Sequence, residues 1–235
     1  LKRAGALGQY RSEVYEGLPA ETGDRESMIS PAYRLIAVTL LYNGRLVRRE
    51  EAPRNLWEAL EERWRGKLVM PDPRLHTTTA AWLLELRRIL GERWSRFVER
   101  LGEQAVLVES FLPAVQRLIA GEFPLAFGYV KYVRLFGGAA GPVDYVRLDP
   151  ILAEAHHVGF SVRPAHEAAG KLFIDTLLSR AGLLAIAQAG GDFVLLPGVY
   201  PPIPDAERLR LLPMRVTEEE LVRARGELER WFRRR

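Results

Sequence analysis

Three consecutive threonines, Thr77 to Thr79, stand where a strand-like segment gives way to a long helix pattern. The strand-like run covers residues 67–70, a short loop covers residues 71–76, and the helix pattern continues to Gly91. In open α/β sheets, ligands bind beyond the carboxyl ends of strands, and a helix N-terminus offers free N–H groups to an anion. The hydroxyls would add donors, so this segment predicts an anion-binding corner. The alternative is that one threonine caps the helix and the others face solvent.

Other residue types that could bind a ligand or take part in catalysis are scattered. Ser110 begins the segment "FLPAVQRLIAG", where its hydroxyl could donate to a ligand or only cap a helix. His156 and His157 are adjacent, but neighbouring residues of a strand point to opposite faces, so we do not expect them to share a metal ion. No G-x-S-x-G, H-E-x-x-H or Walker pattern occurs. An α/β enzyme that uses the Thr77–Thr79 helix N-terminus as a phosphate site stays open as an alternative, although neither a base nor a nucleophile can be named for it.

Composition and charge indicate an ordinary globular protein. The 235 residues are 48% hydrophobic and 27% charged, and no apolar run approaches the roughly 18 residues of a membrane-spanning helix. The net charge of +4 comes from basic residues dispersed among 30 acidic ones, so nucleic-acid binding is not expected. The chain has no cysteine, which excludes disulfides and thiolate metal sites.

Strand-like and helix-like segments alternate along the chain, which predicts an α/β fold with mainly parallel sheets. The predicted strands cover residues 33–43, 67–70, 105–110, 124–133, 142–150 and 156–162. The predicted helices cover residues 52–66, 77–90, 92–102, 111–122, 165–190 and 217–235. The last of these helices opens with a capping box from Thr217 to Glu220.

Five segments together resemble the extracellular solute-binding proteins of ABC importers, in particular the ferric-iron-binding-protein-like group. They are "AGALGQYRS" (4–12), "LLYN" (40–43), "APRNLWEALEERWRGKLVMPDPRLHTTT" (52–79), "LIAGEFPLAFGY" (118–129) and "HEAAGKLFIDTLLSRAGLLAIAQAG" (166–190). The resemblance covers about residues 4–205. It implies a periplasmic-binding-protein type II fold, in which two α/β lobes are joined by crossing strands and the ligand lies in a cleft between them.

The resemblance also implies where the lobes divide. Residues 34–43 and 156–164 would be the crossing strands. Residues 42–157 would then form one lobe, and residues 1–41 with 158–235 would form the other. Family members carry a signal peptide and a first βαβα segment before their counterpart of "AGALGQY". Neither precedes it here, so we expect the second of these lobes to lack its N-terminal part.

The same resemblance implies a small solute as the ligand. The iron binders of the group use two adjacent tyrosines, whereas Tyr129 and Tyr132 are three positions apart and would face opposite sides of a strand. A small anion, such as a phosphonate, phosphate ester or carboxylate, is therefore favoured over ferric iron, and Lys131 near the cleft would attract it. Tyr33 and Arg34 open a crossing strand and would contact the cleft; packing against the preceding loop is the alternative.

We therefore expect a monomeric binding protein without catalytic activity, cofactor or nucleic-acid partner. It would deliver its solute to the permease subunits of an ABC importer in the membrane, and it would act in the periplasm or outside the cell. The predicted ligand-binding residues are Tyr33, Arg34, Thr77, Thr78, Thr79, Ser110, Tyr129 and Lys131.

Overall fold

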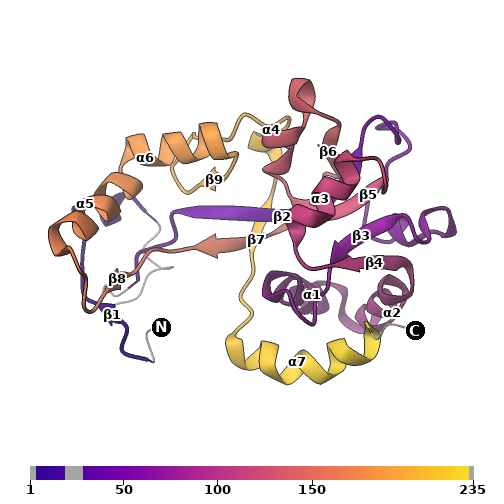
Figure 1. Cartoon of the computed structure of the whole chain (residues 1–235), viewed down its shortest axis with the longest axis horizontal. Coiled ribbons are helices and arrows are strands. Elements are labelled where there is room, and N and C mark those ends of the chain that lie inside the picture. The colour runs from indigo at the N-terminus through magenta and orange to yellow at the C-terminus, as the bar shows by residue number, and fades with distance from the viewer. Residues whose placement is uncertain (1–3, 19–28, 233–235) are drawn as a thin grey trace. The chain divides into compact units, whose positions relative to one another are not determined.

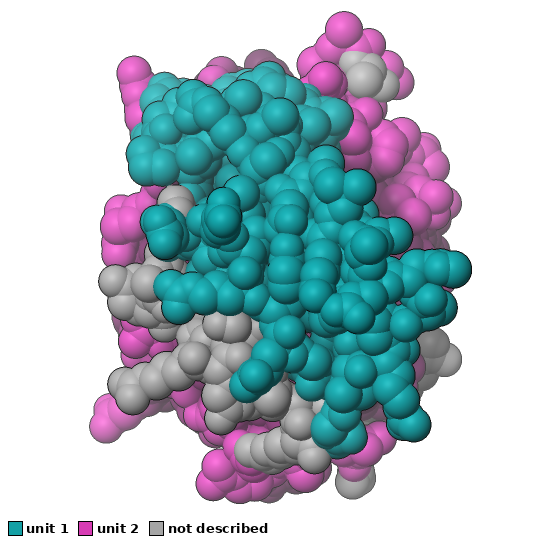
Figure 2. Space-filling model, turned by 90° about the vertical axis from the view of Figure 1, so that its left-hand side faces the viewer, with its two compact units in different colours: residues 1–36, 155–207 teal, residues 37–154, 208–235 magenta. Residues whose placement is uncertain are grey.

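A computed structural model describes residues 4–18 and 29–232 of the chain (Figure 1). The chain divides into two compact units, which are coloured separately in Figure 2. Unit 1 comprises residues 1–36 and 155–207, and unit 2 comprises residues 37–154 and 208–235. Two strands, β2 (Arg34–Asn43) and β7 (Ile151–His156), carry the chain from one unit to the other.

The sheet of unit 2 is mixed rather than mainly parallel. Besides β2 and β7 it contains β3 (Leu68–Pro71), β4 (Ala105–Val108), β5 (Leu125–Tyr129), β6 (Val143–Tyr145) and β10 (Leu211–Pro213). The strand order is β10–β7–β2–β5–β3–β4, and β6 also pairs with β2. β3 is parallel to β4 and β5, and β10 is parallel to β7, whereas β2 is antiparallel to β5 and β6.

The strands in the middle of this sheet are continuously apolar because both of their faces are covered. Leu68, Val69 and Met70 of β3 are fully buried, as are Leu40 and Leu41 of β2. A strand that is buried on both faces reads as an unbroken apolar run rather than an alternating one. The sequence pattern therefore located these strands correctly.

The helices of unit 2 are α1 (Thr77–Leu90), α2 (Trp94–Gln104), α3 (Phe111–Ile119), α4 (Tyr132–Phe136) and α7 (Glu218–Trp231). Short 3-10 turns lie at η3 (Glu58–Leu60), η4 (Glu62–Trp64), η5 (Gly91–Arg93) and η6 (Gly138–Ala140). The predicted helix over residues 52–66 is wrong, because only η3 and η4 form there. The Asn55 carboxamide accepts hydrogen bonds from the N–H groups of Trp57 and Glu58, and this local turn competes with a helix.

Residues 208–235 belong to unit 2, which differs from their predicted place in the other lobe. Their helix α7 begins with the predicted capping box, in which Thr217 and Glu220 each accept a hydrogen bond from the other's N–H group. Arg88 of α1 then bonds both Glu220 and Glu85. The Arg88–Glu220 ion pair, together with packing, attaches α7 to α1, a contact that local sequence periodicity does not reveal.

Unit 1 surrounds a smaller apolar cluster. Its elements are β1 (Leu7–Gly8), η1 (Glu13–Gly17), β8 (Phe160–Ser161), α5 (Glu167–Leu178), α6 (Arg180–Ala185), the π-helical turn η7 (Ile186–Gly190) and β9 (Phe193–Val194). η8 (Ala206–Arg208) follows where the chain passes into unit 2. The buried members of the cluster are Tyr15, Leu18, Tyr33, Phe160, Ile174, Leu178, Leu183, Ala187 and Val194.

The predicted return strand over residues 156–164 is misplaced. The strand that returns to unit 1 is β7, Ile151–His156, and only Phe160–Ser161 forms a further strand, β8, which pairs with β1. β7 forms against β10, with Ile151 opposite Leu211, and such a distant partner cannot be identified from local sequence.

No single helix of the described residues has the length and apolar character of a membrane span. One bent pair, Glu167–Leu178 with Arg180–Gly190, satisfies that test by length and composition alone.

Two glycines of unit 2 give a matched test of the packing. A Cβ at Gly102 would lie 2.2 Å from the carbonyl oxygen of Trp231, so Gly102→Ala should destabilise unit 2 by about 1–3 kcal/mol. Apart from the backbone of its own helix and its chain neighbours, no atom lies within 4 Å of a Cβ built at Gly226, inside α7, so Gly226→Ala should stabilise by about 0.5–1 kcal/mol. Urea unfolding of both variants measures this difference. Equal stabilities would contradict the close approach of α2 and α7.

Candidate functional site

Three strands of unit 2 end at one edge of its sheet, because β3 is parallel to both β4 and β5. The residues after these ends begin α1, α3 and α4. Ligands of open α/β sheets bind beyond the carboxyl ends of strands, so this edge is the candidate site. We call the residues that follow the three strand ends the strand-end cluster: His76, Thr77, Thr78, Thr79, Ser110, Phe111, Tyr129, Lys131 and Tyr132.

The loop from β3 to α1 is organised by Asp72, which is only 6% exposed. Its carboxylate accepts hydrogen bonds from the backbone N–H and from the Nε of Arg74, each at 2.9 Å. Its carbonyl oxygen accepts from the N–H groups of Leu75 and His76, at 3.0 and 2.8 Å. The guanidinium neutralises a carboxylate that would be costly to bury alone. The loop thereby fixes where α1 begins.

The residue that caps α1 is His76. Its Nδ1 accepts a hydrogen bond from the N–H of Thr79 at 3.3 Å and lies 2.9 Å from the Thr79 hydroxyl oxygen. An accepting Nδ1 places the proton of the neutral imidazole on Nε2. Burial lowers the pKa of His76, against an opposing effect of the Glu154 carboxylate. The alternative in which a threonine caps the helix is therefore wrong, since the histidine takes that role.

The three threonines have three different environments. Thr77 is exposed, Thr78 is half-buried, and Thr79 is buried beneath the cap. The Thr78 hydroxyl donates to Oε2 of Glu154, in β7, at 3.3 Å. This carboxylate stands near the positive end of the α1 dipole, where negative charge is favourable. Only Thr77 and Thr78 are therefore exposed enough to meet a solute directly.

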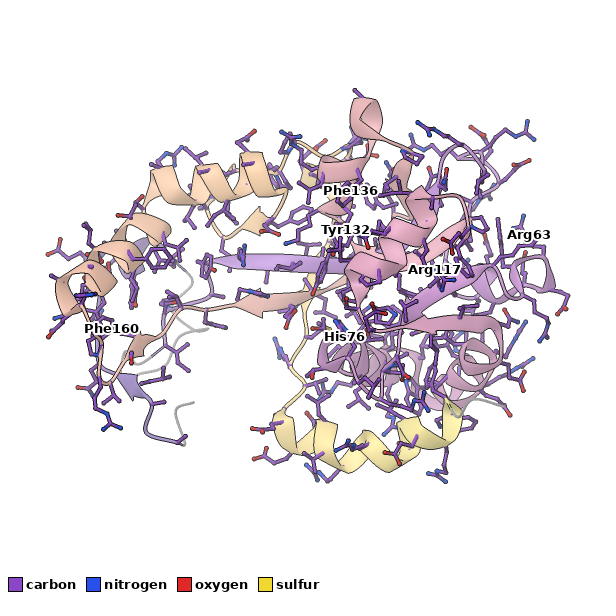
Figure 3. All side chains as sticks on the ribbon, viewed as in Figure 1. Arg63, His76, Arg117, Tyr132, Phe136 and Phe160 are labelled. Atoms are coloured by element: carbon purple, nitrogen blue, oxygen red, sulfur yellow. The ribbon has the colours of Figure 1, made fainter. Side chains whose placement is uncertain are left out.

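Aromatic rings connect the starts of the three helices. The ring centroids of His76 and Phe111 are 4.8 Å apart, and those of Phe111 and Tyr129 are 4.6 Å apart. The row continues from Tyr129 to Tyr132 at 5.7 Å and from Tyr132 to Phe136 at 5.8 Å. Figure 3 labels His76, Tyr132 and Phe136 along this row. These contacts show that α1, α3 and α4 begin close together.

The predicted continuous strand over residues 124–133 is wrong. β5 ends at Tyr129, Lys131 has helical backbone angles of −56° and −21°, and α4 begins at Tyr132. Because the backbone turns, Tyr129 and Tyr132 place their rings in contact instead of on opposite faces of a strand. The spacing argument against a tyrosine pair therefore fails, and any argument about iron must come from the environment of the two phenols.

That environment does not favour a ferric ion held by two phenolates. Tyr132 is 8% exposed, and burial raises its pKa. The ammonium nitrogen of Lys131 lies 5.4 Å from the centroid of the Tyr129 ring, a cation–π contact that places a positive charge where a ferric ion would have to bind. The described residues also contain no group of three or more histidine, aspartate or glutamate side chains arranged to hold a metal ion.

Ser110, Tyr33 and Arg34 differ in their relation to the cluster. Ser110 is half-buried at the N-cap position of α3, where its side chain makes no capping hydrogen bond. Tyr33 packs into the unit 1 core. Nη1 of Arg34 donates to Oδ2 of Asp192 at 2.7 Å, and its Nη2 lies 3.4 Å from Nδ1 of His156. Tyr33 and Arg34 thus have partners inside unit 1, and the other predicted residues belong to unit 2.

Three residues of the site were missed by sequence reasoning: His76, Phe111 and Glu154. Histidine is not among the preferred N-cap residues, so "HTTT" directed attention to the threonines instead. Phe111 has the appearance of an ordinary apolar helix residue. Glu154 reaches Thr78 across 76 positions of sequence, and no local signal indicates such a contact.

Residues 37–191 match the sequence profile of a family described as bacterial extracellular solute-binding protein. No curated protein sequence matches the chain. Structural similarity to solved proteins is extensive. The substrate-binding protein of an ABC transporter from Agrobacterium tumefaciens superposes with a TM-score of 0.83 at 13% identity, over 99% of this chain and 74% of that one.

Two further solved structures have the same fold. The periplasmic binding protein AfuA from Actinobacillus pleuropneumoniae, described with exogenous fructose-6-phosphate bound, gives a TM-score of 0.82 at 16% identity, over 98% of this chain and 78% of that one. Iron-bound HitA from Pseudomonas aeruginosa gives a TM-score of 0.74 at 14% identity, over 100% of this chain and 78% of that one. These similarities confirm the predicted periplasmic-binding-protein type II fold.

The cap made by His76 predicts a pH dependence of stability. The pKa of His76 is lowered by folding, so below about pH 6.5 the unfolded chain takes up a proton that the folded chain resists. Stability from this group is therefore complete above that pH and is lost as the pH falls. Asn caps helices without titrating, so His76→Asn should lose less stability than the parent between about pH 7.5 and about pH 5.5. The urea midpoints of the parent and of His76→Asn at the two pH values measure this difference. An equal loss of stability in the two proteins would contradict the role of His76.

Proposed function

We propose that this chain, which belongs to the family of bacterial extracellular solute-binding proteins, is the solute-binding component of an ABC importer. It would capture a small solute in the periplasm or outside the cell and deliver it to a permease in the membrane. The family match over residues 37–191 supports this function, as do solved structures of the same fold that are described as binding proteins. Membrane association would come from docking on the permease.

We infer that the solute is a small anion that contacts the strand-end cluster. The observation that carries this inference is the convergence of three helix starts at one sheet edge, shown by the ring contacts from His76 through Phe111 to Tyr129. Lys131 adds a positive charge beside Tyr129. The hydroxyls of Thr77 and Ser110 add donors that suit phosphate or carboxylate oxygens, and the Thr78 hydroxyl would exchange its bond to Glu154 for one to the solute.

The proposed ligand set keeps the residues named from sequence but gives them different roles. Thr77, Thr78, Ser110, Tyr129 and Lys131 would contact the solute. Thr79 would act through His76, whose position it helps to fix. Tyr33 and Arg34 stay predictions for the contribution of unit 1 to the ligand, with Arg34 oriented by Asp192.

A panel of small phosphate esters, phosphonates and carboxylates should contain a ligand that raises the melting temperature without being turned over. For that ligand, Lys131→Met should weaken binding about tenfold or more, because a charge-assisted hydrogen bond contributes about 1.5–3 kcal/mol. Replacing Thr77 and Thr78 together by alanine should weaken binding to a smaller extent. Titration calorimetry provides the dissociation constants.

Matched controls for these substitutions are Lys67→Met and Thr176→Ala, which change exposed residues outside the strand-end cluster. Unchanged affinity in both cluster variants would overturn the anion site. Hydrolysis of a phosphate ester in the same samples would instead favour the alternative, an α/β enzyme that uses the α1 N-terminus as a phosphate site.

Ferric iron is the other solute to test, because HitA is an iron-bound neighbour. We expect no purple-red phenolate–iron colour on adding ferric iron with a soluble anion. The buried phenol of Tyr132 resists ionisation, and the positive charge of Lys131 beside Tyr129 would repel a ferric ion. Absorption spectra of the parent and of Tyr129→Phe decide the matter. A charge-transfer band that is present in the parent and lost in the variant would show that iron is the ligand.

A further inference from the structure

A pocket of unit 2 lies along α1, from Trp82 to the C-terminal end of the helix, and shares no residue with the strand-end cluster. Its volume is about 400 Å³, within the range of about 300–1,000 Å³ that is usual for small-molecule sites. Its lining comes from the loop before η3, the last turns of α1 with η5, and the segment that leads into β7. Because α1 rises about 1.5 Å per residue, the residues of α1 that line the pocket lie from about 9 Å (Trp82) to about 20 Å (Ile89) beyond His76 along the helix.

The interior of this pocket is apolar. Trp82, Leu86 and Leu152 are buried and form its floor, and Trp82 is held edge-on against Phe127 at 4.7 Å. Nearer the solvent, Trp57 is half-buried and Ile89 is 41% exposed. An apolar floor that continues to exposed apolar side chains at the mouth is the arrangement expected for the hydrophobic part of a small ligand.

The charged groups around the mouth are mainly arginines. Arg54, Arg93 and Arg147 line the pocket together with one carboxylate, Asp149. Asp149 already accepts a hydrogen bond from Nε of Arg210 at 2.8 Å, and Arg147 donates to Asp144 and to the carbonyl oxygen of Tyr145. Within residues 4–18 and 29–232, neither Arg54 nor Arg93 has an ion-pair partner, and both are exposed.

The position of Arg93 strengthens this charge asymmetry. Arg93 is the N-cap residue of α2 and makes no side-chain capping bond. The N-terminus of a helix carries partial positive charge, so a guanidinium at this position has an unfavourable interaction with the helix dipole. An anion placed beside Arg93 would interact favourably with both the guanidinium and the helix end.

We propose that this pocket binds a small amphiphilic carboxylate, with its acyl chain or ring over Trp57 and Ile89 and its carboxylate between Arg54 and Arg93. This site is independent of the proposed solute site, since it shares no residue with the strand-end cluster. The apolar floor accounts for the hydrophobic part of the ligand, and the two exposed guanidiniums account for its negative charge.

Decanoate, below its micelle concentration, is the probe, with acetate and decanol as matched compounds that lack the chain or the charge. Decanoate should change the tryptophan fluorescence and bind the full chain at submillimolar concentration, and acetate should not bind. Arg93→Glu should weaken binding about fivefold, as expected for reversing one exposed charge, whereas Arg96→Glu, on the same helix but outside the pocket, should not. Ile89→Asp should abolish binding without lowering the melting temperature.

Three outcomes would overturn the proposal. If decanoate does not bind, or if decanol binds as tightly as decanoate, the ligand is not an amphiphilic anion. Binding that survives both Ile89→Asp and Arg93→Glu would place decanoate elsewhere on the chain. A concentration-dependent dimer that Ile89→Asp dissociates in sedimentation experiments would assign the pocket to a second copy of the chain.

Discussion

The parallel pairing of β3 with strands on both of its sides determines the arrangement of unit 2. Leu68 stands opposite Ala105 of β4 and Leu125 of β5, so the three strands run in one direction and end together. A parallel pair cannot close through a tight turn, and each connection must return over the sheet, here through α1, α2 and α3. The starts of the following helices are consequently gathered at one edge. The burial of Leu68, Val69 and Met70 is the stabilising contribution that keeps this register.

Helix starts that gather at one edge also gather partial positive charge, and the chain compensates for it with its own groups. Glu154 brings a carboxylate to the beginning of α1 through Thr78, and His76 supplies a neutral acceptor to the free N–H of Thr79. Burial keeps that imidazole neutral, and a neutral Nδ1 is required for it to accept. A solute that binds here therefore meets an edge whose α1 end is already capped, whereas Ser110 at the start of α3 makes no capping hydrogen bond with its side chain and can donate to an anion.

Sequence patterns succeeded where local chemistry determines the structure. α1 was delimited by its apolar periodicity and by Gly91, which adopts a φ of +56°, and the capping box of α7 was found from Thr217 and Glu220 alone. Sequence patterns failed where the structure is determined by a partner that is distant in sequence. The apolar segment after Leu125 is equally compatible with a longer strand, and it turns after Tyr129 because Val130 makes the last bond to β2, at Ala37. The candidate site was predicted only in part for the same reason. The three threonines are consecutive in sequence and could be recognised, whereas Glu154 lies 76 positions from Thr78 and could not.

The two ends of α1 illustrate how a structural explanation can be separated from a functional one. Arg87 and Arg88 in its last turn are favoured by the negative end of the helix dipole, and they bind Glu227 and Glu220 of α7, so their presence is explained by stability. That explanation does not extend to Arg93, which stands at the positive end of α2, or to Ile89, an apolar side chain that remains 41% exposed. An acidic residue at position 93 and a polar residue at position 89 would give a more stable fold. The combination that is present is unfavourable for the isolated fold and favourable for an apolar ligand that carries a negative charge.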